Sequence, residues 1–356
     1  MAQLNTKKNI VLKAVSARVT NVVRSSTGGE FGLGYVQDQY DAVQLFPEEG
    51  IKLSLSRLSA AGKLEFSYYD SQIPVALQMG DRIFLDVDGV PVFRGYLFEK
   101  KETKSKLIVA VAYDCMRYLL NKDSYPRPVE TYKSYVGWVA NQFGFHFNAV
   151  NDQWDGVGPM VADGETYLDM MMKYRREVVL RTGNFYEVCA SRQRHGELIF
   201  RSMAQYPWKT ILTNSMVEDY EYTESIDSDD VANIVDIQYK TGQNEPVNTI
   251  TRKNDQLITE WGPLWVIEEV EMSASEATLY AETLLALMGE PQRTFKLTRC
   301  LTDTLLVEPG SPVVASFQLD NKKIENWMMI ESITYTIKSS ILTADITLLG
   351  NGINAT

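Results

Sequence analysis

Short runs of alternating apolar and polar residues occupy the first third of the chain, and this two-residue period constrains the fold most strongly. Residues 51–55 and 63–68 alternate strictly, which places one face of each run in a core and the other toward solvent or a partner. Asp88-Gly89 lies between the apolar runs 83–87 and 92–101 and indicates a hairpin, because both positions accept positive φ. Strands at this spacing predict a small β barrel or sandwich over residues 1–120.

A change of periodicity at Asp114 marks a second unit. Asp114 can cap a short helix, and Pro126 and Pro128 then mark a boundary. Two later segments place their apolar residues on one helical stripe, and two more have the pattern of hairpin strands. The four segments are, in chain order, residues 131–143, 165–181, 184–190 and 197–201. Residues 121–217 are therefore expected to form a small α/β unit.

The last third, residues 218–356, returns to β-type alternation, with one helix inserted at about residues 273–288. Ser273 and Glu276 fit a capping box, in which the hydroxyl accepts from an orphan backbone N–H and the carboxylate reaches back. Gly289 ends the helical stripe. The predicted fold class is therefore β-rich α+β, with two small β barrels, one in each terminal unit, and the small α/β unit between them.

Segments near the two ends of the chain resemble each other in pattern. Gly80–Leu85 has a counterpart in Gly310–Ala315, and a turn, a return strand and a final strand follow in both places. The later counterparts are residues 88–89 with 320–321, 93–99 with 327–333, and 107–113 with 341–348. The likeness is one of pattern rather than identity, which unrelated β meanders also share. If it reflects common architecture, one chain contributes two similar barrels, and three chains would present six around a ring.

The net charge of −11 is concentrated in the last third of the chain. Residues 218–356 carry 9 Lys and Arg and 23 Asp and Glu, a net charge of −14, whereas the first two units are close to neutral. This imbalance indicates that the last third is a separate unit. Acidic surface also disfavours non-specific nucleic-acid binding, which depends on basic side chains that displace counterions.

The cysteines and the N-terminal residues indicate the cellular compartment in which the protein folds. Cys115, Cys189 and Cys300 are odd in number and far apart in sequence, which suits neither a disulfide framework nor a zinc site, so three buried thiols are expected. No run approaches the roughly 20 apolar residues of a membrane span. Residues 1–8 lack the apolar core of a secretory signal. We therefore expect a protein that matures in the cytoplasm and has no membrane partner.

Two histidines are the natural candidates for a catalytic base near neutral pH. His146 lies between phenylalanines, where a packed or hydrogen-bonded imidazole is favoured over a catalytic one, and His195 lies in a polar stretch typical of a hairpin tip. His195-Gly196-Glu197 shares the His-x-Glu of zinc deaminases, but no Pro-Cys-x-x-Cys follows. The chain also lacks His-Glu-x-x-His and Gly-x-Ser-x-Gly. No catalytic residue is predicted.

Candidate phosphate and metal sites fail on their spacing. The glycine cluster Gly28, Gly29, Gly32 and Gly34 lacks the Lys-Ser/Thr of a P-loop and has Gln37 where a dinucleotide fingerprint needs glycine. A calcium loop starting at Asp227 fails at three positions, so the acidic run 218–230 is interpreted as a solvated linker or strand edge. A glycoside hydrolase needs a pair of carboxylates, but with 46 acidic residues some pair is always available, so this criterion does not identify a hydrolase site. No cofactor-binding or metal-binding residue is predicted.

The most specific sequence pattern spans residues 80–125. Its second half, residues 109–125, reads VAVAYDCMRYLLNKDSY. This stretch resembles the phrase T-A-Y-D-x-x-R-Y-L-x-N-K-D-x-Y of XkdQ/YqbQ-type baseplate hub proteins, which belong to contractile phage tails and phage-tail-like bacteriocins. Tyr222–Ile226 with Asn233–Val235 looks like the family's Y-S-x-S-I…N-x-V. The resemblance covers roughly residues 40–350, although Cys115 and Met116 replace the usual polar residues after Tyr-Asp.

The resemblance implies a structural role without catalysis. It implies a homotrimer whose two tube-type barrels per subunit form a pseudo-six-fold ring between the tail tube and the central spike. The implied partners are the tail tube or a tube-initiator protein, the spike, other baseplate proteins and a tape-measure protein in the lumen, with no specific nucleic acid. Carboxylates of residues 218–356 are expected to line this channel, with outward-facing carboxylates that maintain solubility as the alternative.

Two other functions remain open. A tail-associated cell-wall hydrolase would need a catalytic pair that the sequence does not mark. A carbohydrate-binding or receptor-binding tail protein would need an exposed aromatic platform, for which Trp261 and Trp265 are the candidates. The sequence around them, Trp-Gly-Pro-Leu-Trp, instead favours packing beneath a β turn.

Overall fold

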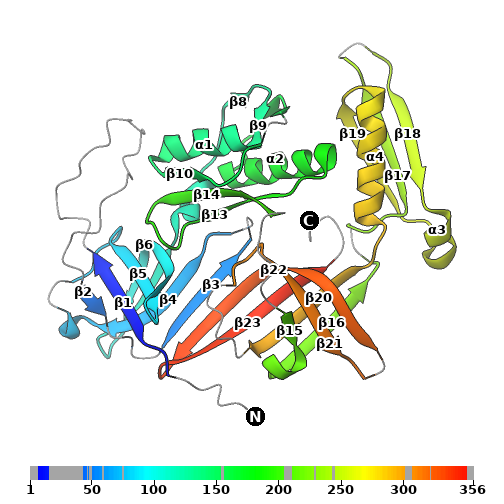
Figure 1. Ribbon diagram of the computed structural model, residues 1–356. Coiled ribbons are helices and arrows are strands. Elements are labelled where there is room, and N and C mark those ends of the chain that lie inside the picture. Colours follow the sequence, from blue (N-terminus) through cyan, green and yellow to red (C-terminus); the bar gives the residue numbers. More distant parts are fainter. Residues whose placement is uncertain are drawn as a thin grey trace.

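The computed structural model describes most of the chain. The described residues are 7–15, 43–45, 47, 50–57, 60–73, 76–153, 156–203, 211–227, 230–242, 245–300, 307–320 and 322–350. Across these ranges the protein is rich in β structure, with two long helices above one large sheet and a smaller unit that projects from one end (Figure 1). No helix in these ranges is both long and apolar enough to span a membrane.

One sheet of 13 described strands forms the base of the molecule, and it draws its strands from both ends of the chain (Figure 1). Its N-terminal strands are β1 (Ile10–Val15), β2 (Val43–Leu45), β3 (Ile51–Ser56), β4 (Lys63–Tyr69), β5 (Arg82–Val87), β6 (Val90–Glu102) and β7 (Leu107–Tyr113). Its C-terminal strands are β15 (Ile211–Thr213), β16 (Asp219–Ser225), β20 (Gln292–Cys300), β21 (Pro312–Gln318), β22 (Lys323–Lys338) and β23 (Ile341–Gly350). The expected alternation holds, because residues such as Leu53 and Leu64 are buried in one shared core while Lys52 is exposed.

The two terminal units are joined edge to edge within this sheet. The second half of β22 pairs antiparallel with β3, so that Thr334 lies opposite Ser54 and Ile337 opposite Ile51. The main path runs β16-β20-β23-β22-β3-β4-β7-β6-β5-β1-β2, and β15 and β21 branch from β22. The strands expected to form two separate barrels therefore belong to one continuous sheet, and its described strands do not close into a barrel.

The internal duplication predicted from the pattern is present in the strand order. The order β3-β4-β7-β6-β5 of the first unit corresponds to β16-β20-β23-β22-β21 of the second, with every pairing antiparallel. Each of the two predicted segments contains three of these strands. The correspondence is wider than predicted, because it covers five strands in each unit.

Matching backbone hydrogen bonds fix the equivalence residue by residue. Leu97 accepts from the N–H of Gly80 at 2.8 Å and donates to the carbonyl of Asp81 at 2.8 Å. Ile330 accepts from the N–H of Gly310 at 2.7 Å and donates to the carbonyl of Ser311 at 3.0 Å. Gly80 and Gly310 both have positive φ, which favours glycine at this turn. Leu97 is thus equivalent to Ile330, one residue away from the alignment expected from the sequence.

A β-bulge follows the matched residue in both units. The register between β6 and β7 shifts between Leu97 and Glu99, and the register between β22 and β23 shifts between Ile330 and Ser332. Phe98 and Glu331 are therefore the equivalent bulged residues. A bulge at the same place in both units supports the residue-by-residue equivalence of β6 and β22.

A helical unit covers the sheet above β3 to β6 (Figure 1). It contains η2 (Cys115–Leu120), α1 (Tyr132–Phe143), α2 (Tyr167–Thr182) and a sheet of β10 (His146–Ala149), β14 (Glu197–Ser202) and β13 (Tyr186–Ala190). Short pairs join β8 (Pro126–Arg127) to β12 (Met160–Val161) and β9 (Glu130–Thr131) to β11 (Gly156–Val157). The expected helices and hairpin are confirmed. The helices were predictable because their N-caps and the Gly183 C-cap depend only on residues close in sequence.

A second α/β unit is inserted between β16 and β20 and projects from the sheet (Figure 1). It contains β17 (Ile234–Lys240), β18 (Asn248–Lys253), α3 (Asp255–Trp261), β19 (Trp265–Glu271) and α4 (Ala274–Met288), and α4 packs on the three-stranded sheet β18-β17-β19. The capping box of Ser273 and Glu276 is confirmed, with both hydrogen bonds present. The sequence predicts only α4 in this unit and places the strands around it in a barrel; neither α3 nor the separate three-stranded sheet is predicted.

Candidate functional site

A buried ionic joint lies where the N-terminal strands, the helical unit and β22 meet. Arg57, directly after β3, donates from Nη2 and Nε to Oε1 of Glu187 on β13, at 2.8 and 3.1 Å. Arg175 of α2 reaches the same oxygen at 3.2 Å, and Arg57 also lies 3.4 Å from Glu331 on the β22 bulge. Arg57 is 5% exposed and Glu187 3%. Burial raises the pKa of Glu187, and Arg57 opposes this effect. The joint ties together three segments that are far apart in sequence.

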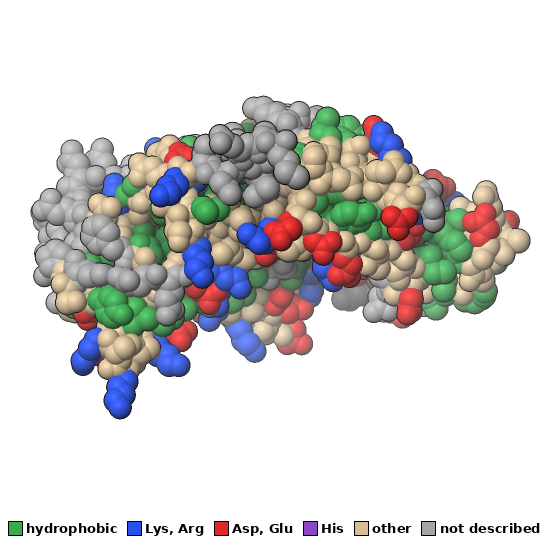
Figure 2. Space-filling model, turned by 90° about the horizontal axis from the view of Figure 1, so that it is seen from below, with side chains coloured by type: hydrophobic (Ala, Val, Ile, Leu, Met, Phe, Trp, Pro, Cys, Tyr) green, Lys and Arg blue, Asp and Glu red, His purple; other side chains and the backbone are tan. Residues whose placement is uncertain are grey.

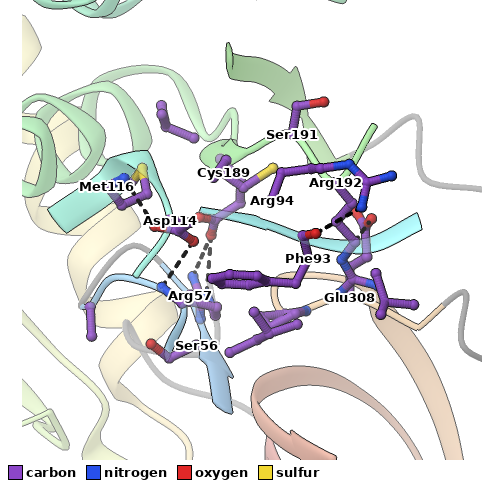
Figure 3. Close-up of a pocket in the computed structure, with 18 of the residues that line it drawn as sticks. Ser56, Arg57, Phe93, Arg94, Asp114, Met116, Cys189, Ser191, Arg192 and Glu308 are labelled. Carbon is purple, nitrogen blue, oxygen red and sulfur yellow. Dashed lines mark hydrogen bonds and ion pairs between the residues drawn. The ribbon is translucent and has the colours of Figure 1, made fainter. Parts of the chain in front are cut away.

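A second ionic cluster joins the helical unit to the C-terminal strands. Glu308, just before β21, accepts from Arg201 of β14 at 2.8 Å and lies 3.5 Å from Arg192 in the β13–β14 hairpin. Arg192 also donates to the carbonyl of Val307 at 3.4 Å, and the hydroxyl of Tyr335 donates to that carbonyl at 3.1 Å. Arg57, Arg192 and Glu308 all face one small hollow (Figure 3).

Asp114 forms the floor of the same hollow. Its carboxylate accepts from the N–H of Gly62 at 2.9 Å and from the N–H of Met116 at 2.9 Å, so it caps η2 and holds the β3–β4 turn (Figure 3). Burial raises the pKa of Asp114 to about 7, although the two backbone hydrogen bonds act in the opposite direction. A shift of this kind often marks catalytic carboxylates, but both oxygens of Asp114 are occupied by backbone donors.

Gly62 supplies a test of how tightly this turn is packed. A Cβ at position 62 would lie 2.5 Å from the Asp114 carboxylate and 2.8 Å from Cδ2 of Leu55. We expect Gly62→Ala to lower the free energy of unfolding by about 1–3 kcal/mol in a urea titration, because neither neighbour can move freely. Gly242→Ala is the matched control, since the nearest atom to its Cβ would be 3.9 Å away. Equal stability of the two variants would show that the turn yields.

The hollow between these groups is too small for a substrate. Its volume is about 50 Å³. A water molecule occupies about 30 Å³ of liquid, whereas small-molecule sites usually measure about 300–1,000 Å³. Cys189 lines the hollow and is partly exposed, but burial raises its pKa to about 11, so its thiol stays protonated and unreactive at neutral pH. The geometry is that of a structural joint rather than a catalytic centre.

The two histidines occupy different environments. His195 lies at the tip of the β13–β14 hairpin, as expected, and docks onto β6 with Nε2 2.9 Å from the carbonyl oxygen of Gly95. Burial lowers its pKa to about 3, so the neutral ring donates from Nε2. His146 was expected to be packed or hydrogen-bonded, but its side chain is 48% exposed, with Glu197 3.6 Å away. His195 therefore helps to hold the helical unit on β6, whereas His146 lies at the surface of that unit.

The remaining sequence candidates are dispersed. Gly28, Gly29, Gly32 and Gly34 lie outside the described residues. Residues 219–225 of the acidic run form strand β16 at the sheet edge, in agreement with one of the two expected interpretations. Cys115 and Cys300 are buried as expected, whereas Cys189 is only partly buried. Within the described ranges, no group of three or more His, Cys, Asp or Glu side chains is placed to hold a metal ion.

The family-like phrase of residues 109–125 has a structural role. Asp114 caps η2, and the guanidinium of Arg117 lies 5.5 Å from the ring centre of Tyr113. Asp123 is buried and accepts from the N–H of Tyr125 at 3.0 Å and from the hydroxyl of Tyr135 at 3.2 Å. The phrase therefore connects the N-terminal strands to the helical unit.

Sequence reasoning missed the ionic joint. Arg57 and Glu187 are 130 residues apart, and neither belongs to a motif. The one available signal is Glu187 itself, a charged residue between the apolar Tyr186 and Val188 of a short strand, all three of them buried.

The fold is similar to that of solved phage tail proteins. A 43 kDa tail protein of prophage MuSo2 from Shewanella oneidensis has a TM-score of 0.63 at 14% identity, with 96% of this chain and 98% of that chain covered. A tail protein from Neisseria meningitidis MC58 has a TM-score of 0.66 at 13% identity and 97% coverage of both chains. No curated protein matches the sequence.

A third similar structure comes from a secretion machine. It is the E. coli c3393 protein, described as a type VI secretion component with structural similarity to the T4 bacteriophage tail proteins gp27 and gp5. Its TM-score is 0.50 at 11% identity, with 86% of this chain and 74% of that chain covered.

Residues 51–349 match the YQBQ-like family, and the chain belongs to that family. The resemblance first seen in residues 109–125 is thereby confirmed over most of the chain. Family and fold together support a structural role in a phage-type tail.

Proposed function

We propose that this protein is the baseplate hub subunit of a contractile injection particle, where it joins the tail tube to the central spike as a homotrimer. The observation that carries the proposal is the internal duplication, in which two five-strand units share one strand order and one set of turn hydrogen bonds. Three chains with two such units each would present six similar units, which suits contact with a six-fold tube on one face and a three-fold spike on the other.

The remaining parts of the proposal follow from this arrangement. The two units, each curled into a tube-type barrel in the assembled ring, lie within residues 1–120 and 218–356, with β15 (Ile211–Thr213) added to the second, and the helical unit within residues 121–217 stands outside the ring. The likeness to a type VI secretion component related to gp27 and gp5 favours a hub position. The partners are the tube or a tube initiator, the spike, other baseplate proteins and a tape-measure protein in the lumen. No catalytic role is assigned, because the buried charges are fully engaged in joining segments.

A reconstruction of the assembled tail tests the proposal. We expect three copies of the chain on the particle axis, between the tube and the spike. Six copies, or a position away from the axis, would contradict it. The same map tests the role of the acidic last third. We expect carboxylates of residues 218–356 to line the channel wall. Such a wall would repel nucleic acid, because the duplex carries a negative charge about every 1.7 Å. A lumen lined mainly by Lys and Arg would overturn that part.

A carbohydrate-binding or receptor-binding role is the second candidate, because Trp265 is not packed beneath a turn as expected. Its side chain is 61% exposed on β19, near Ile267, which is 59% exposed. An exposed indole can stack on a sugar or a partner surface. Binding of the purified chain to host cells that is lost in Trp265→Ala would favour this candidate. Clearing of purified cell walls would instead favour a hydrolase.

A further inference from the structure

Two strand edges in the described sheet lack a pairing strand, although their duplicates are paired. In the second unit, β22 pairs with β21 up to Met329 and then, on the same edge, with β3 from Ser332 to Ile337. In the first unit, β6 pairs with β5 up to Tyr96, and no described strand follows on that edge beyond the Gly80–Leu97 turn bonds. The duplicate of β3 is β16, and among the described strands β16 pairs with β20 alone. The pairing of β22 with β3 is therefore made within the chain, whereas the equivalent pairing of β6 with β16 is not.

We propose that the second half of β6 in one copy pairs antiparallel with β16 of a neighbouring copy, in the register of the β22–β3 joint. This inference rests on the proposed function for the closure of the ring, and it adds the interface and its register. Around the ring, the β22–β3 joint within each chain would then alternate with a β6–β16 joint between neighbouring chains. Three copies joined head to tail in this way would close one continuous sheet. Unpaired strand edges readily add a strand from another chain, because their N–H and C=O groups are free to bond.

The hydrogen-bonded duplicates determine the register. Leu97 is equivalent to Ile330, so Lys101 corresponds to Thr334, four residues further along. Leu64 and Phe295 occupy equivalent places opposite Ala112 and Leu348, which makes their partners Leu53 and Tyr222 equivalent. Ser54 therefore corresponds to Thr223. Since Thr334 lies opposite Ser54 within the chain, Lys101 lies opposite Thr223 of the neighbouring copy.

The charges of the two edges are complementary. Residues 99–106 contain four lysines and two glutamates, whereas residues 218–225 contain four acidic residues and no basic one. The derived register places Lys100 opposite Glu224 and Lys101 diagonal to Glu221. Within the chain Glu224 already pairs with Lys322 and Glu221 with Lys296, so the lysines of the neighbouring copy would extend these ion pairs across the joint, where cross-strand pairs of opposite charge stabilise sheets. Lys and Arg side chains gather on a projection at one end of the molecule, whereas Asp and Glu side chains are more frequent from its middle to its other end (Figure 2).

An exposed phenylalanine supplies a second, independent observation. Within the chain, the carbonyl of the bulged Glu331 accepts from the N–H of Arg57 at 2.9 Å, and their side chains form an ion pair. Their duplicates are Phe98, which is 37% exposed, and Ile226, which is partly exposed. The proposed joint therefore replaces an ionic contact by an apolar one and covers Phe98. A second copy of this chain is the occupant, because no other partner would share the register of β3.

Engineered cysteines test the register. Directly opposite residues in antiparallel strands have Cα atoms about 4.5–5.5 Å apart, which suits a disulfide. We expect full-length Lys101→Cys/Thr223→Cys, oxidised at high micromolar concentration or within purified tails, to give a non-reducing gel ladder that ends at three chains. Ser54→Cys/Thr334→Cys is the matched reference, because these residues face each other within one chain and their hydroxyl oxygens lie 3.4 Å apart. That pair should link without any increase in mass.

An out-of-register pair separates this register from random contact. Lys101→Cys/Asp219→Cys moves one cysteine four residues, about 13 Å, and should not link. Trimers of the unmodified chain that fail to link through Lys101→Cys/Thr223→Cys, or that link equally out of register, would overturn the interface while leaving the hub proposal intact. A chain that is not trimeric in solution or in the tail would instead overturn the proposed function and this interface with it.

Discussion

Glu187→Ala is expected to lower the free energy of unfolding by about 3–5 kcal/mol, the largest effect that a single substitution in this protein should produce through charge. The substitution leaves Arg57 buried without its main acceptor and removes the carboxylate oxygen that Arg57 and Arg175 share. Taking a guanidinium out of water is costly unless it is paired, and here the pairing holds three segments together. Urea unfolding followed by tryptophan fluorescence measures the change.

An exposed ion pair provides the control for Glu187. Arg252 and Glu282 lie 3.2 Å apart, with side chains 36% and 55% exposed. Glu282→Ala should change the free energy of unfolding by less than about 1 kcal/mol, because water and salt screen such pairs. If Glu187→Ala were no more destabilising than Glu282→Ala, the buried cluster would not be the joint that holds the helical unit on the sheet.

The stability of the protein relative to Asp114→Asn is expected to fall as pH rises from about 4 to about 7. Burial raises the pKa of Asp114 from 3.8 in the unfolded chain to about 7 in the folded protein. The folded state therefore favours the protonated carboxyl, so this contribution is fully present below pH 3.8 and is lost by about pH 7. Each pKa unit corresponds to about 1.4 kcal/mol, which gives a total of roughly 4 kcal/mol.

The asparagine variant isolates this group from every other carboxyl. It has the shape of the neutral side chain and does not titrate, so the difference between the two unfolding curves reports on Asp114 alone. Urea titrations at half-unit steps of pH give that difference. A wild-type protein that gains stability relative to the variant as pH rises would show that the hydrogen bonds from Gly62 and Met116 outweigh burial.

Local signals in the sequence were sufficient for η2, α1, α2 and α4 and for many of the strands, but not for α3. The Ser273 and Glu276 capping box, the Asp114 cap and the Gly183 stop each satisfy backbone groups within a few residues, so they act in the same way in any tertiary context. Alternation located β3 and β4 because one face of each is buried. The turn glycines Gly80 and Gly310 indicated the duplication because both positions have positive φ, which favours glycine.

Non-local contacts were beyond the sequence. The three strands β17, β18 and β19 alternate as barrel strands would, and only their partner α4 shows that they form a separate unit. The backbone hydrogen bonds at Leu97 and Ile330 place the two units one residue away from the expected alignment, because an apolar pattern alone does not fix which residues of distant strands correspond. Trp265 was expected to pack beneath a turn, yet no local rule fixes which face of an edge strand is covered.

The sequence by itself determined the β-rich class, the caps and turns, the family phrase and the duplicated pattern, because each depends on residues close together in the chain. The tertiary structure alone decided that the two terminal units share one sheet through β22 and β3, and that Arg57, Glu187 and Glu331 meet. The reason is physical: a strand edge and a buried charge carry no mark of their partner. Their pairing is selected only when distant segments fold against each other and exclude water.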